Sequence, residues 1–189
     1  MIRLATASDA AAIAAIYDPV VARTAISFET DPPGPAEMAR RIESVLPFAP
    51  WLVDDTAGSI RGYAYASKHR ERAAYRWCVD VTVYVDAAHR RRGVGRKLYE
   101  VLFELLRLQG FYAAHAGVTL PNPQSVALHE SLGFRPVGTY PRVGWKRGAW
   151  HDVGWWQLEL RERKGAPDEP LTPLEAGRNP AWAATLAGG

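Results

Sequence analysis

The stretch HRRRGVGRKL, residues 89–98, gathers arginine and lysine side chains around two glycines, Gly93 and Gly95. It follows the strand-like run VTVYV and opens a leucine-rich stretch with helical spacing. A strand, a glycine turn and a helix N-terminus together form an anion site, because first-turn N–H groups lack intrahelical partners and the helix dipole adds positive charge. Glycine also lets a ligand approach the main chain. The stretch therefore predicts a phosphate-binding turn, without naming the anion.

The spacing of this turn excludes two common phosphate sites. A dinucleotide fingerprint needs a third glycine at position 98, where this chain has Leu98. The P-loop pattern G-x-x-x-x-G-K-S/T occurs nowhere in the chain. A nucleic-acid patch stays as an alternative, disfavoured by a net charge of only +3. A solvated basic turn is the other alternative.

Asp80 is a second candidate for chemistry, because it lies between Val79 and Val81 in a valine-rich run. A carboxylate there is unfavourable unless it is paired, so Asp80 is either a base or half of a buried ion pair, for example with Arg76 or with an arginine of the following loop. His151 and Asp152 are neighbours on one predicted strand and therefore point to opposite faces, which indicates a structural role or a subunit interface.

Composition fits a single globular domain of 189 residues with 48% apolar and 23% charged side chains. We expect this domain over residues 1–163, followed by a tail over 164–189 that is poorly ordered or bound across the surface. The lone Cys78 excludes an intrachain disulfide, and the histidines show no zinc spacing. No signal peptide or membrane span is evident, so we expect a cytoplasmic protein that binds neither membrane nor metal.

Hydrophobic periodicity predicts a mixed α/β order in which hairpin signals favour a mostly antiparallel sheet. In the run from Val79 to Val85 the valines share one face, and Asp80, Thr82 and Tyr84 share the other. The predicted strands cover residues 2–5, 51–55, 59–67, 75–85, 111–120, 134–145 and 150–160, and the predicted helices cover 10–21, a stretch starting near Pro35, 95–109 and 123–133.

The glycine turn fits the pattern R/Q-x-x-G-x-G/A through Arg90, Gly93 and Gly95. Here the chain resembles the GNAT superfamily of N-acetyltransferases. NPQSVALHESLGF (122–134) is similar to that superfamily's second coenzyme A segment. KRGAWHDVGWWQLEL (146–160) is similar to its phosphinothricin and methionine sulfoximine N-acetyltransferase branch. The likeness covers roughly residues 2–160 and leaves out the tail.

This resemblance implies an α/β (α+β) acetyltransferase fold, with a mixed, mostly antiparallel twisted sheet of about seven strands and about four flanking helices. It also implies that acetyl-CoA, as co-substrate, lies where two central strands splay apart. The pantetheine arm would pair with main chain at the end of the central strand, and turn N–H groups and arginines would hold the pyrophosphate. The implied donor-binding residues are Val83, Tyr84, Val85, Arg90, Arg91, Arg92, Gly93, Val94, Gly95, Arg96, Asn122 and Ser125. For Asn122 a simple turn role is the alternative.

The resemblance also suggests the acceptor, the α-amine of a small acidic amino-acid analogue. Asp80 stands where the branch has a glutamate as general base, and the shorter side chain favours a relay through water. His129 would protonate the departing thiolate, with a structural histidine as the alternative. Arg70 and Arg72 would bind the acidic end of the acceptor, or form only a charged surface loop. Phe28 would wall the acceptor pocket, or be a core residue.

The resemblance further implies a homodimer. Two alternatives to this function stay open. The fold could serve another amine, namely a polyamine, an aminoglycoside or a protein N-terminus. It could also be a coenzyme A-binding sensor without turnover.

Overall fold

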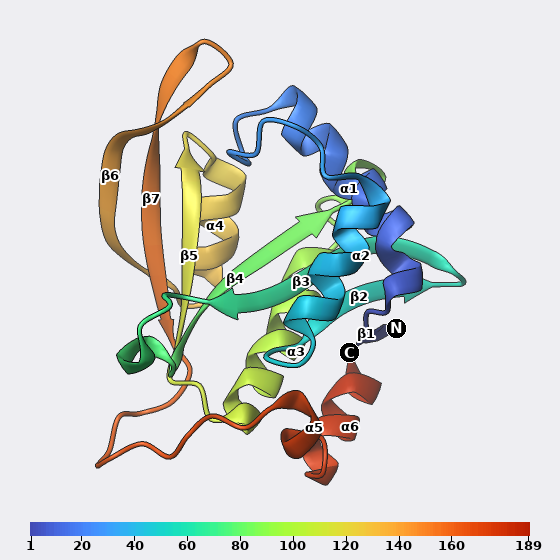
Figure 1. The fold of residues 1–189 in the computed structure, drawn as a ribbon, viewed down its shortest axis with the longest axis vertical. Coiled ribbons are helices and arrows are strands. Elements are labelled where there is room, and N and C mark those ends of the chain that lie inside the picture. Colours follow the sequence, from blue (N-terminus) through green and yellow to red (C-terminus); the bar gives the residue numbers. More distant parts are fainter.

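A seven-stranded sheet forms the centre of the computed structural model, which describes residues 1–189 (Figure 1). Its strand order is β1-β2-β3-β4-β5-β7-β6, and every neighbouring pair is antiparallel except β4 and β5. The predicted fold class is therefore confirmed. The strands are β1 (Ile2–Leu4), β2 (Trp51–Thr56), β3 (Ser59–Lys68), β4 (Cys78–Val85), β5 (Ala113–Leu120), β6 (Arg135–Lys146) and β7 (Ala149–Glu159).

Helices cover both faces of this sheet. One face carries α1 (Ala10–Arg23) and α2 (Gly34–Val45), and the other carries α3 (Val94–Gln109) and α4 (Pro123–Ser131) (Figure 1). Thr6 and Asp9 form a capping box ahead of α1. Short 3-10 turns, η1 (Ala7–Asp9), η2 (Ala73–Tyr75) and η3 (Ala87–His89), connect the longer elements.

Strand β4 separates two hydrophobic cores by the alternation of its side chains. Val79 and Val81 are buried in the core that α3 shares with the sheet. On the opposite face Tyr84 packs against the core beneath α1 and α2, with its ring 5.6 Å from Tyr63. This confirms the predicted valine face and polar face of the strand.

The sheet opens in the middle, because β4 and β5 pair only from Cys78 to Asp80 with Ala113 to His115. Beyond that point β4 stays bonded to β3 as far as Val85, and β5 stays bonded to β7 as far as Leu120. The edge of β4 from Val81 to Val85 that faces β5 is consequently unpaired. Figure 1 shows the two strands diverging in the centre of the molecule.

The tail after Lys164 lies across the surface of the domain. It contains α5 (Pro173–Ala176) and α6 (Pro180–Gly188), both of which contact α3. Trp182 and Ala176 are buried there, and Arg76 forms an ion pair with Glu169. In Figure 1 the two termini lie close together. A membrane-crossing helix is not found, since none has the required length and apolar character.

Candidate active site

The predicted phosphate-binding turn joins β4 to α3. Gly93 has φ +80° and Arg91 has φ 59°, so both adopt the left-handed region, which glycine enters without steric cost. No side chain caps α3, and its first N–H groups are left for a ligand. A Cβ at Gly95 would lie 3.4 Å from Leu128 and 3.5 Å from Val85, so the main chain here approaches both closely. This local geometry suits an anionic ligand.

A cavity of about 520 Å³ lies against this turn. It extends from the turn along the unpaired edge of β4 to the start of α4. The cavity is lined by Val20, Ile26, Val83, Tyr84, Val85, His89, Arg90, Arg91, Gly93, Val94, Gly95, Arg96, Asn122, Gln124, Ser125 and Leu128. The structure thus brings together all the predicted donor-binding residues except Arg92, which does not line the cavity.

A smaller cavity of about 90 Å³ continues between β4 and β5. It shares Ile26, Asn122 and Ser125 with the larger cavity and reaches His129. Ile26 was not predicted, because a single isoleucine in a loop gives no signal in the sequence. The two cavities together form one path from the glycine turn into the opening between the strands.

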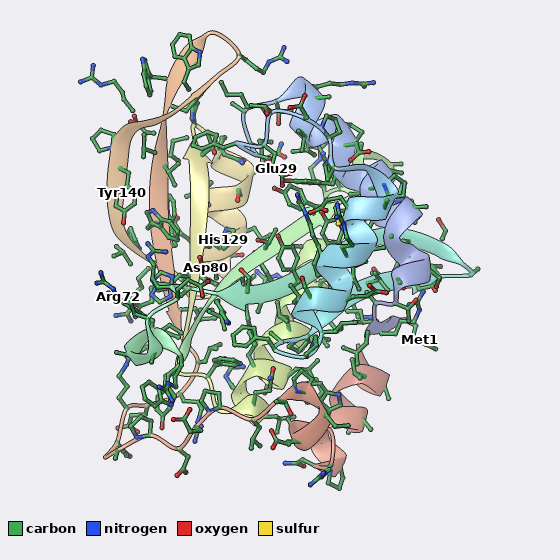
Figure 2. All side chains as sticks on the ribbon, viewed as in Figure 1. Met1, Glu29, Arg72, Asp80, His129 and Tyr140 are labelled. Carbon is green, nitrogen blue, oxygen red and sulfur yellow. The ribbon has the colours of Figure 1, made fainter.

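Asp80 lies at the base of this opening, where β4 and β5 part (Figure 2). Its partner is His69, whose Nδ1 lies 2.6 Å from Asp80 Oδ1. The suggested ion pair with Arg76 is wrong, because Arg76 pairs with Glu169 of the tail. Burial raises the pKa of the Asp80 carboxyl above its ordinary value, while His69 and the charge of Arg70 act to lower it. Asp80 is therefore a perturbed carboxyl with a defined partner.

Beside Asp80, the sequence did not indicate His69 and His115. Their rings stack with centroids 4.2 Å apart and an interplanar angle of 16°. Burial and the neighbouring His69 lower the pKa of His115. For His69 one signal was available. If the strands at 59–67 and 75–85 pair as an antiparallel hairpin, the residues that follow the first strand lie near Asp80. Nothing local to His115 indicated its position.

The side chains of His69, Asp80 and His115 place possible metal-ligand atoms within 4.8 Å of one another. A zinc ion needs nitrogen and oxygen ligands at ~2.0–2.2 Å, with lone pairs that converge on the metal. The lone pairs of two nearly parallel imidazoles lie in the planes of their rings and run side by side. This geometry favours a hydrogen-bonded group over a metal centre.

His129 is buried on α4, with 4% of its surface exposed. Its Nδ1 lies 2.8 Å from the main-chain oxygen of Ser125, so Nδ1 carries the hydrogen and donates. Its Nε2 lies 3.2 Å from the Tyr99 hydroxyl, which donates to it. Burial lowers the pKa of His129. These contacts favour a neutral imidazole beside the smaller cavity.

Arg70 lies close to Asp80 and the stacked histidines. Its guanidinium carbon is 5.6 Å from the centroid of the Trp155 ring, and its Nη1 donates to the His69 main-chain oxygen at 2.7 Å. The Arg72 side chain makes no hydrogen bond or ion pair, and Figure 2 places it on the outer side of the same loop, farther from the opening than Asp80. The structure thus brings only the first of the two predicted arginines to the site.

Phe28 lies in the loop between α1 and α2 and reaches β6. It is 39% exposed, so the alternative of a core residue is wrong. Its ring packs over Gly144, where any Cβ would overlap it, and its centroid lies 6.3 Å from that of His151. His151 and Asp152 do not pair: His151 Nε2 lies 3.0 Å from Lys146 O, and Asp152 accepts the Arg142 N–H at 2.7 Å.

Comparison with known proteins tests the resemblance directly. A family model described as an acetyltransferase (GNAT) domain matches residues 2–155. The chain is 40% identical over 173 residues to a phosphinothricin N-acetyltransferase of Streptomyces viridochromogenes, covering 92% of this chain and 93% of that protein. It is 37% identical over 172 residues to an L-methionine sulfoximine/L-methionine sulfone acetyltransferase of Salmonella typhimurium, covering 88% and 98%.

A solved structure agrees with these relatives. The crystal structure of a GNAT superfamily phosphinothricin acetyltransferase from Sinorhizobium meliloti, in complex with AcCoA, matches with a TM-score of 0.85 and 34% identity, over 90% of this chain and 94% of that one. The family model covers most of the chain, and the relatives are matched along nearly their whole length. This chain therefore belongs to the GNAT family of acetyltransferases.

Proposed function

We propose that this N-acetyltransferase transfers an acetyl group from acetyl-CoA to the α-amine of a small acidic amino-acid analogue of the phosphinothricin or methionine sulfoximine type. The observation that carries the donor half is the unpaired edge of β4 from Val81 to Val85, next to an uncapped helix N-terminus. The acceptor class is supported by the names of the relatives.

The donor half uses main-chain groups. Main-chain groups of Val83, Tyr84 and Val85 would pair with the pantetheine arm as an added strand, because that edge of β4 has no partner. N–H groups from Arg91 to Arg96 would hold the pyrophosphate at the start of α3. Asn122 accepts the Ser125 N–H at 3.2 Å as the cap of α4, which leaves its amide N–H groups for the arm.

The acceptor half uses side chains. Arg70 would pair with the carboxylate or phosphinate of the acceptor, because a guanidinium offers two parallel donors to such a group. Its position near Asp80 would then place the acceptor amine at the base of the opening. Phe28 would close the pocket from the loop between α1 and α2. Arg72 would contribute only through long-range attraction, since its side chain forms no hydrogen bond or ion pair near the opening.

The reaction needs a neutral amine and a polarised thioester carbonyl. Asp80, together with its partner His69, would remove the amine proton. A main-chain N–H near Val85 would polarise the thioester carbonyl. His129 was predicted as the acid for the departing sulfur. Its Nδ1–H is directed to Ser125, and burial lowers its pKa, so these contacts favour a role in shaping the cavity with Tyr99.

The direct test mixes pure protein with acetyl-CoA and a panel of amines while thiol release is followed. We expect release to depend on phosphinothricin or methionine sulfoximine, with the N-acetyl product seen by mass spectrometry. Stimulation by a polyamine, an aminoglycoside or a peptide N-terminus instead would contradict the proposed acceptor. Binding of acetyl-CoA with no amine-stimulated release would show a sensor rather than an enzyme.

We also propose a homodimer formed through β6. This strand ends the sheet, so one edge of it is unpaired. Large apolar side chains are exposed on the β6–β7 hairpin, namely Val137, Tyr140, Val143, Trp145 and Trp150. An unpaired edge beside an apolar patch favours association with a second copy. Analytical ultracentrifugation should find a two-chain species, and a monomer at micromolar concentration would contradict this.

The proposed compartment is the cytoplasm, where acetyl-CoA is available and a single free thiol such as Cys78 stays reduced. There, acetylation of a toxic amino-acid analogue would confer resistance to it. Expression of the gene in a sensitive host should permit growth on phosphinothricin or methionine sulfoximine, whereas growth equal to that of the empty vector would contradict the resistance role.

A further inference from the structure

The cluster of Asp80, His69 and His115 contains more than the proposed function uses. The His69 side chain is 13% exposed and that of Asp80 is 28% exposed, so both are largely enclosed. The His69 ring lies between the face of His115 at 4.2 Å and the edges of Tyr75 at 5.8 Å and Trp155 at 6.2 Å. An imidazole held on three sides by rings and on a fourth by a carboxylate has a fixed orientation.

The hydrogen bond to Asp80 determines which nitrogen of His69 carries the hydrogen. A carboxylate only accepts, so His69 Nδ1 carries the hydrogen and donates to Asp80 Oδ1 at 2.6 Å. His69 Nε2 then keeps its lone pair. This Nε2 atom makes no hydrogen bond and is not fully enclosed, so solvent can reach it. A positioned imidazole with a free Nε2 is an arrangement suited to a general base.

The groups around His69 fit a proton-accepting role. The ionisable groups that face it are Asp80 on β4, His115 on β5, Arg70 in its own loop and Tyr75 on η2. His115 Nε2 lies 3.2 Å from Gln157 Oε1, and burial keeps its pKa low. His115 is therefore neutral, and it does not repel a positive charge on His69. The Asp80 carboxylate stabilises that charge.

We propose that His69 is the residue that takes the proton from the acceptor amine, and that Asp80 is a positioning residue that holds it. This rests on the proposed function. The Asp80 carboxylate already accepts the Nδ1–H of His69, which leaves the lone pair on His69 Nε2 to accept a proton.

The acceptor ammonium gives one proton to His69 Nε2, and His69 returns this proton to solvent. The neutral nitrogen forms a bond to the acetyl carbon, and the carbon–sulfur bond breaks with its electron pair on sulfur. The second nitrogen proton goes to that sulfur, which yields the amide, the free thiol and one released proton.

The experiment measures turnover of the wild type, H69N, H69A, D80N and the double variant H69N/D80N with acetyl-CoA and the acceptor. H69N keeps an N–H toward Asp80, and H69Q replaces it if H69N does not fold. The matched control is E71Q, which removes an exposed charge from the same loop. We expect H69N to lower kcat by about 100-fold or more. Acetyl-CoA affinity and E71Q turnover should stay at the wild-type level.

Three readouts separate a base from a merely structural histidine. The acidic limb of the wild-type kcat/KM profile against pH should disappear in H69N. Added imidazole should restore turnover to H69A. The double variant should lose little more than either single variant, because the two residues act as one unit.

Wild-type turnover in H69N, no rescue of H69A by imidazole, or losses that multiply in the double variant would overturn the proposal and leave Asp80 as the base. A wild-type protein that acetylates no amine would overturn the proposed function itself, so the two failures are distinguishable.

Discussion

The two halves of the site are built from different parts of the chain. The proposed donor half consists mainly of main-chain groups that lie close in sequence, from Val83 to Arg96. The proposed acceptor half consists of side chains from separate elements, such as Phe28, His69, Asp80 and His115. A main-chain site tolerates side-chain changes but not a change of backbone shape, whereas a side-chain site depends on single atoms. The predictions below test this contrast.

The largest effect is expected for Asp80→Asn. The amide keeps the shape of the side chain but no longer fixes the His69 hydrogen on Nδ1, so the base is misplaced. Turnover should fall by about 100-fold or more. Isothermal titration should give an unchanged Kd for acetyl-CoA, because the proposed donor site uses main-chain groups away from Asp80. Equal losses of turnover and of acetyl-CoA affinity would mean that the two halves are not separable.

Gly95→Val tests the donor half. The Cβ of any residue here lies 3.4 Å from Leu128 and 3.5 Å from Val85, and the added methyl groups of valine would crowd both. Overpacking of about 1–3 kcal/mol corresponds to an acetyl-CoA affinity about 5- to 150-fold weaker. The matched controls are Gly95→Ala, which makes only ordinary contacts, and Arg92→Ala, which removes a charge outside the cavity. A larger loss from Arg92→Ala than from Gly95→Val would refute a main-chain donor site.

The contrast between local main-chain groups and distant side chains also explains which features could be predicted from the sequence. The seven strands and the turn at Gly93 were predictable because alternation and glycine spacing are local. The donor residues followed from the turn. The faces of β4 were predictable for the same reason, since Val79 and Tyr84 differ by an odd number of positions.

The acceptor half was less predictable because its contacts span long sequence separations. Asp80 was found from its unfavourable surroundings, but its partner was not, since His69 and His115 meet only through the register of β3, β4 and β5. The pairing of Arg76 with Glu169 likewise required the path of the tail. Neither the arginine at position 76 nor the glutamate at position 169 indicates by its residue type that the two will pair.

Arg70→Gln tests the acceptor half at its outer side. The loss of a charge-assisted hydrogen bond to the acceptor should raise its KM by about 10-fold. The Kd for acetyl-CoA should not change. Arg72→Gln is the matched control, because Arg72 lies in the same loop and its side chain forms no hydrogen bond or ion pair, and its effect should be smaller. Equal effects of the two variants, measured at several salt concentrations, would show general attraction rather than a specific contact.

The smallest effect is expected for Glu29→Gln, which tests how the loop carrying Phe28 is held. Glu29 accepts hydrogen bonds from Arg41 at 2.7 and 3.0 Å and from the Tyr17 hydroxyl at 2.7 Å. Lys146 Nζ donates to the main-chain oxygen of Glu29 at 2.7 Å. Because the Arg41 and Glu29 side chains are each 34% exposed, solvent screens the pair. Loss of this ion pair should lower the free energy of unfolding by about 0.5–1 kcal/mol.

The pH dependence has a definite sign. Arg41 lowers the pKa of Glu29 below its unfolded value, so the stabilisation is complete above the unfolded pKa near ~4.3 and is lost as the pH falls through the folded pKa. Urea unfolding should therefore separate wild type and variant at pH 7 and bring them together in acid. The acceptor KM should rise slightly while acetyl-CoA affinity stays constant. A variant that weakens acetyl-CoA instead would show that this loop supports the donor half.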